Sequence, residues 1–172
     1  EWPRTLHAQA IDNLNQAGAK VIGYDVVFAD SSTEDETLAT AIAEADDVVL
    51  AAVGVPPVFR TEQGIAYDSF LLPVSSLEQA ASSIGHANVV PDRDGTVRRL
   101  PLIVVDSSSG QVYPSLTLAV LYREFNMDLP QDYPLDAPLA PLRHPARHHI
   151  SQPFQQDLRP PQTERGSGNR HP

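Results

Sequence analysis

Two apolar runs of strand length, separated by a helix-like segment, constrain the fold of this chain most. The runs KVIGYDVVFAD (20–30) and VVLAAVGV (48–55) are rich in valine and isoleucine, as expected for strands covered on both faces. The segment between them places Leu38 and Ile42 at helical spacing. Strands separated by helices predict a mostly parallel sheet with crossover helices, and therefore an α/β fold.

A further helix is expected at the amino-terminal end, in WPRTLHAQAIDNLNQAG. Its apolar residues Leu6, Ile11 and Leu14 fall near one face, which we expect to be buried. His7 is expected on a polar face, and Gly18 suits the left-handed residue that ends a helix.

Two more helices are expected, in SSLEQAASS and in YPSLTLAVLYREFNM. Thr33 with Glu36, and Ser75 with Glu78, have the spacing of capping boxes. These pairs predict that helices begin close to Thr33 and Ser75.

The stretch GHANVVPDRDGTVRRLPLIVVD predicts a late antiparallel hairpin, with a strand, a tight turn and a second strand. Asp92 and Asp94 favour the turn, and Gly95 supplies a positive φ. Arg98 and Arg99 follow, and they must point to opposite faces because side chains alternate along a strand.

Charge and proline divide the chain into residues 1–129 and 130–172. The first part has 7 basic and 18 acidic residues, a net charge of −11, whereas the second has 5 and 4. Nine of the 16 prolines lie in the second part, where they oppose helix formation. We expect a folded domain over 1–129 and a disordered tail, rich in Pro, His and Arg, over 130–172.

Composition excludes several classes of function. The chain has no cysteine, so disulfides and thiolate chemistry are absent. A net charge of −10 argues against a nucleic-acid partner. No apolar run approaches the roughly 18 to 20 residues that cross a bilayer. The chain opens at EWPRTLH, without Met, and we expect it to be a fragment.

Five residues are candidates for ligand binding: Asp25, His86, Asn88, Arg98 and Arg99. Asp25 interrupts an apolar strand, where an unpaired carboxylate is costly to bury, so it requires a structural partner or a ligand. His86 and Asn88 begin a strand, and a merely hydrogen-bonded histidine at a strand end is the alternative interpretation. The two arginines suit an anion, or simply a charged hairpin end.

An alternative is a small metal-dependent α/β hydrolase, whose carboxylates would be Asp25, Asp30, Asp35 and Asp46 or Asp47. Most of these acids also suit a helix amino terminus, which favours negative charge. The chain lacks G-x-S-x-G, G-x-G-x-x-G and the P-loop motif. We expect no catalysis, no metal and no cofactor for this chain.

Several segments together resemble the second type of CHASE domain, from about Trp2 to about Tyr122. They are WPRTLHAQAIDNLNQAGAKVIGYDVVFAD, DETLATAIAEADDVVLAAV, IGHANVVPDRDGTVRRLPL and YPSLTLAVL. The most specific are AGAKVIGYDVVF and the pattern G-x-x-N-x-x-P-D-x-D-G-x-x-R, from Gly85 to Arg98.

The resemblance implies an extracellular or periplasmic sensory domain of a bacterial receptor in the cell membrane, which is not itself an enzyme. Its expected partners are a small-molecule ligand, a cytoplasmic adenylate or diguanylate cyclase or a kinase as output, and a second copy in a homodimer. The family implies no agreed ligand and no set of binding residues. Residues 1–129 would then form a partial sensory domain.

The chain departs from the family at both ends. An apolar strand ahead of WPR is missing, which should expose an apolar face or an unpaired edge. Beyond Leu129 the family continues with strands and a helix, whereas this sequence resembles translation in a wrong frame. A truncated product without function is therefore a third interpretation.

Overall fold

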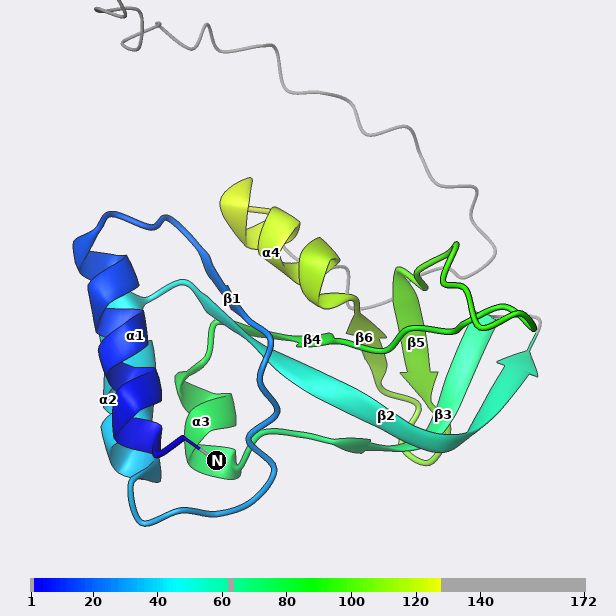
Figure 1. The fold of residues 1–172 in the computed structure, drawn as a ribbon, viewed down its shortest axis with the longest axis horizontal. Helices are drawn as coiled ribbons and strands as arrows, with labels where there is room; N and C mark the ends of the chain where they lie inside the picture. The colour runs from blue at the N-terminus through cyan, green and yellow to red at the C-terminus, as the bar shows by residue number, and fades with distance from the viewer. Residues whose placement is uncertain (1, 62–63, 128–172) are drawn as a thin grey trace, which may run out of the picture. The chain divides into compact units, whose positions relative to one another are not determined.

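The computed structural model describes residues 2–61 and 64–127, which form a mixed α/β unit (Figure 1). The helices are α1 (Arg4–Gln16), α2 (Asp35–Ala45), α3 (Ser75–Ala80) and α4 (Leu116–Glu124). The strands are β1 (Ile22–Tyr24), β2 (Val48–Thr61), β3 (Gly64–Leu71), β4 (Ser83–His86), β5 (Ile103–Asp106) and β6 (Val112–Pro114). The α/β class is confirmed, and the tail predicted over 130–172 lies outside the described residues.

The sheet is organised around β2, which is long enough to belong to two parts of it (Figure 1). Its first half pairs in parallel with β1 on one side and with β4 on the other. Its second half pairs antiparallel with β3, after a register shift between Val55 and Val58. Two prolines lie at this shift, and neither has an N–H to donate to a ladder. The sheet continues with β5, parallel to β3, and β6, antiparallel to β5.

Residues 85–106 do not form the hairpin expected from their sequence. Their ends belong to β4, which pairs with β2, and to β5, which pairs with β3 and β6. The turn itself is present, because Gly95 has a φ of 79° and its N–H donates to the Asp92 carbonyl. Turn chemistry is local and does not determine which strands pair. The late antiparallel hairpin is instead β5–β6, where the Asp106 carboxylate accepts from Ser108 in the turn.

The apolar core lies where α1, α2 and α3 pack together with β1 and β2. Helix α2 buries Leu38 and Ile42 completely, as their spacing predicts. Other side chains without solvent exposure in this core are Ile11, Phe28, Val48, Leu50 and Leu77.

Helix α1 buries a different face from the one its leucines predicted. Leu6 and Leu14 are 45% and 44% exposed, whereas Arg4, His7 and Ile11 are buried. The placement of His7 on a polar face was wrong, because its Nδ1 lies 2.8 Å from the Tyr24 hydroxyl. Buried polar groups need such partners. Because the buried face of α1 includes polar residues, the positions of its hydrophobic residues alone do not predict that face.

Arg4 is the polar anchor of this core. Its Nε donates to the Asp35 carboxylate (3.1 Å) and its Nη2 to the Asp30 carbonyl (2.7 Å). The guanidinium also lies over the Phe28 ring, 4.5 Å from its centroid. The capping box expected at Thr33 is not formed, because α2 begins at Asp35 and its N-cap is Glu34. The Asp35 carboxylate also accepts from the Ser32 N–H.

The other expected helix signals have mixed outcomes. Ser75 does not cap α3, whose N-cap is Val74 without a side-chain bond. Gly18 follows α1 with a φ of 84°, as predicted. Across residues 2–61 and 64–127, no helix combines the length and the apolar character needed to span a bilayer.

Candidate functional site

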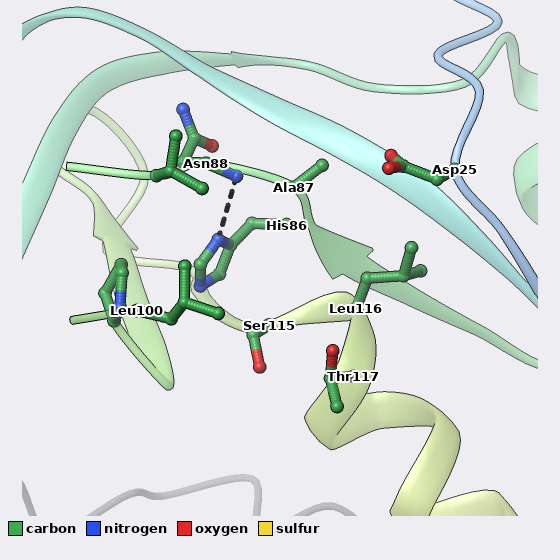
Figure 2. A pocket seen from close by; sticks show the side chains of 10 residues that line it. Asp25, His86, Ala87, Asn88, Leu100, Ser115, Leu116 and Thr117 are labelled. Atoms are coloured by element: carbon green, nitrogen blue, oxygen red, sulfur yellow. Dashed lines mark hydrogen bonds between the residues drawn. The ribbon is translucent and has the colours of Figure 1, made fainter. Parts of the chain in front are cut away.

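A cleft of about 200 Å³ lies between the end of β4 and the first turn of α4 (Figure 2). It combines an acidic side chain, a histidine, several small polar groups and apolar walls. The lining residues are Asp25, His86, Ala87, Asn88, Val89, Leu100, Pro101, Ser115, Leu116 and Thr117.

Gly85 allows α4 to approach β4 closely enough to form one wall of this cleft. A Cβ at this position would lie 2.5 Å from the Leu116 Cα and 2.9 Å from its backbone nitrogen. Only glycine avoids that overlap without moving the helix. The next residue, His86, forms a parallel bridge with Ser115, the N-cap of α4. The backbone therefore places His86 beside the start of the helix.

The His86 ring is neutral at physiological pH. The residue is only 2% exposed, and burial lowers its pKa to about 4, an effect that the Pro101 carbonyl partly offsets. Nδ1 accepts a hydrogen bond from the Asn88 N–H (3.3 Å). Because a neutral imidazole has one donor and one acceptor, its proton must lie on Nε2.

This Nε2 makes no hydrogen bond of normal geometry to any residue that the structure describes. The Pro101 carbonyl influences the pKa of the ring, but the pair does not meet hydrogen-bond geometry. In Figure 2 the ring projects between Leu100 and Ser115, both of which line the cleft. A buried donor without an acceptor lowers the stability of the folded state by about 1–3 kcal/mol. An oxygen acceptor placed at Nε2 would therefore stabilise the site.

Asn88 holds the neighbouring wall in place. Its Oδ1 accepts from the Gly54 N–H (2.7 Å), and its Nδ2 donates to the Gly54 carbonyl (3.0 Å). The amide thus ties the segment after β4 to β2. Asn88 shapes the cleft, and these two bonds already engage both ends of its side chain.

Asp25 reaches the cleft from the end of β1. The expectation that it interrupts a buried strand was wrong, because β1 ends at Tyr24 and Asp25 is exposed. Side chains alternate, so Ile22 and Tyr24 face the core while Asp25 faces the side of α4. It forms no ion pair within the described part of the chain.

The two arginines lie elsewhere. Arg98 donates to the carboxylates of Asp92 (3.0 Å) and Asp94 (3.0 and 2.9 Å) in the exposed turn, and not to Asp25. This contact lowers the pKa of Asp94. Arg99 is exposed, and neither arginine lines the cleft. The structure therefore brings together Asp25, His86 and Asn88.

The sequence reasoning did not identify the first turn of α4 as part of this site. Ser115 caps the helix by accepting from the Leu118 N–H (3.2 Å). The N–H of Thr117 has no partner in the described part of the chain, and its exposed side chain lies at the rim. Ser115 followed by a helical pattern is an N-cap signal that was available in YPSLT.

The acidic residues do not converge as a metal-dependent hydrolase requires. Within the described residues, no three His, Asp or Glu side chains are close enough together to hold a metal ion. Asp35 pairs with Arg4, and Asp47 with Arg123 of α4. These carboxylates stabilise the fold.

One comparison with known proteins gives a match. The family model described as CHASE2 domain matches residues 1–167, which extends beyond the segments that carry the resemblance. Searches of curated proteins and of solved structures found no match to the chain.

Proposed function

The chain belongs to the CHASE2 domain family of extracellular sensory domains, and we propose that it is the ligand-sensing module of a bacterial transmembrane receptor. The observation that carries this proposal is the cleft between β4 and α4, where a buried histidine donor has no acceptor among the residues that the structure describes. Small-molecule sites are typically concave and largely apolar, with a few convergent polar groups.

The position of the cleft suits a sensor. Ligand in it would contact β1 through Asp25, β4 through His86 and α4 through Thr117. The far end of α4 is held separately, by Arg123 on Asp47 and by Lys20 on Glu124. Ligand binding at the first turn of the helix, which rests on β4 through Gly85 and His86, would change how α4 sits on the sheet. Such a differential contact shifts a conformational equilibrium.

In this proposal the domain lies outside the cell membrane, and catalysis belongs to a cytoplasmic output domain. That output is an adenylate or diguanylate cyclase or a kinase, and the receptor acts as a homodimer. The sensory chain contributes recognition and no chemistry.

The test is a thermal-shift screen of the whole 172-residue chain against small polar metabolites. We expect at least one compound to raise the Tm in a saturable way, because a ligand that binds only the folded state stabilises it. Ala87→Leu, which fills the cleft, should abolish that rise, whereas Ala39→Leu on α2, away from the cleft, should keep it. A rise that is equal in wild type and Ala87→Leu, or no rise with any compound, would contradict the proposal.

A further inference from the structure

We propose that the cleft between β4 and α4 binds a small zwitterion, an α-amino acid or a molecule of similar size and charge. Its carboxylate would lie at the first turn of α4 and its ammonium group at Asp25. The assignment deepens the proposed sensing function and rests on it.

The carboxylate end is matched by donors without partners. The first N–H groups of a helix have no acceptor inside it, and they form its positive end. In α4 the Leu118 N–H is capped by Ser115, but the Thr117 N–H has no partner among the described residues. A helix start of this kind binds carboxylates and phosphates.

His86 is an independent indication that the cleft receives a hydrogen-bond acceptor. The side chain is almost fully buried, and its Nε2–H lacks an acceptor in the described part of the chain. Because the ring stays neutral, its N–H can donate to any hydrogen-bond acceptor, and the acceptor does not have to be negatively charged. A carboxylate has two oxygens, so one molecule can bond to both the helix start and the imidazole. Because Nε2 is itself shielded from solvent, the second bond requires the neighbouring Leu100 segment to move slightly aside.

The ammonium end is matched by Asp25. Its carboxylate is the only charged group lining the cleft, and it has no ion-pair partner in the described ranges. A simple anion would be repelled by this carboxylate and by the net charge of −10. A simple cation would leave the His86 donor and the helix start unmet. A molecule with both charges satisfies all three groups.

The size of the cleft limits the rest of the ligand. Its volume of about 200 Å³ falls below the roughly 300–1,000 Å³ of sites for drug-sized molecules. Apolar side chains on the same side of the cleft as His86 and Asn88 form part of its lining, and they belong to Val89, Leu100 and Pro101. A short aliphatic side chain fits this wall better than a charged one.

Calorimetric titration of the whole chain with the 20 standard L-amino acids tests the assignment. The control ligands lack one charge: isobutylamine is valine without its carboxylate, and isovalerate is valine without its ammonium group. We expect a small aliphatic amino acid to bind, with both analogues at least tenfold weaker, because each leaves one end of the cleft unpaired.

Asp25→Asn separates the charge from the shape of the site. Asp25 is exposed and makes no ion pair within the described residues, so the variant should fold normally and bind the amino acid at least tenfold more weakly. Asp68→Asn on β3 makes the same charge change away from the cleft and should bind like wild type.

A second pair of variants tests the imidazole donor. His86→Gln, which keeps a donor near the Nε2 position, should bind the amino acid more tightly than His86→Asn, which does not.

Equal affinity of the amino acid for wild type and Asp25→Asn would overturn the assignment. So would an uncharged or singly charged metabolite that binds more tightly than every amino acid. If Ala87→Leu blocks that metabolite, the sensing function survives and only the zwitterion is wrong. If no compound of either set binds, both proposals fail together.

Discussion

The two parts of the sheet that share β2 differ in how they are covered. The first part, formed by β1, β4 and the start of β2, lies against helices, and its Val48, Val49 and Leu50 are completely buried. In the second part, formed by the end of β2 with β3, β5 and β6, the buried hydrophobic residues are Ala66, Tyr67 and Val104. Large apolar side chains there stay in contact with solvent, and examples are Val58, Phe59, Leu71 and Leu102.

This difference in burial indicates which part of the sheet is rigid and which part can change conformation. Local opening costs least where few apolar contacts are buried. The cleft lies at the boundary, because His86 ends a strand of the first part while Leu100 and Pro101 lead into β5 of the second. A ligand bound there would contact both a well-packed element and a weakly packed one.

The largest effect is expected from the buried arginine. Arg4→Ala should lower the free energy of unfolding by about 3–5 kcal/mol, because the buried Asp35 carboxylate would lose the opposite charge that pairs with it. Arg98→Ala, in the exposed turn of residues 92–98, should leave the urea midpoint unchanged. Equal losses in the two variants would remove the distinction between the two regions.

A matched pair of leucines compares the packing directly. Leu38 is completely buried, whereas Leu71 is 50% exposed. Leu38→Ala should cost about 2–5 kcal/mol, from lost burial and the cavity left behind. Leu71→Ala should cost well below about 1 kcal/mol, as other surface substitutions do. Urea unfolding of both variants measures the contrast, and a ratio near one would contradict it.

The pH dependence of stability should report on His86. Well above pH 6.5 the ring is neutral in both states, so it contributes no slope. Between pH 6.5 and its folded pKa of about 4, only the unfolded chain takes up the proton. The free energy of unfolding should therefore fall in this window, by up to roughly 3 kcal/mol. His86→Asn should remove that part of the slope, and an identical slope in the variant would show that His86 is not held neutral.

The smallest effects concern the approach of α4 to the sheet. In Gly85→Ala the new Cβ meets the Leu116 backbone at 2.5 Å, so the helix must move, and we expect a loss of about 2–3 kcal/mol. In Gly23→Ala it meets only the end of the Val120 side chain, at 2.8 Å, and a loss of about 1 kcal/mol is expected. The reverse order would mean that α4 is not anchored at Gly85.

The sequence predicted those features that depend on local patterns. Leu38 and Ile42 revealed the buried face of α2, and Gly18 revealed the end of α1. It failed where a polar side chain is buried through a distant partner. No local pattern around His7 predicts its contact with Tyr24, and none around Arg4 predicts its ion pair with Asp35.

The candidate site shows the same limit. Asp25, His86 and Asn88 were candidates because of their residue types, but the approach of Thr117 depends on how α4 packs on Gly85. Arg98 was a candidate because of its charge, but that charge is paired with the neighbouring Asp92 and Asp94. Spacing along the chain cannot distinguish a locally paired charge from one that is available to a ligand.

The most direct test of the cleft as the sensing site is a backbone amide NMR titration of the whole chain with pooled L-amino acids. We expect shift changes concentrated at residues 86–89 and 115–118, with the Thr117 amide among the largest. A second pocket, of about 150 Å³, is lined by residues 2–4 and 30–32. Changes confined to that pocket, or spread evenly over the chain, would contradict the assignment of the site.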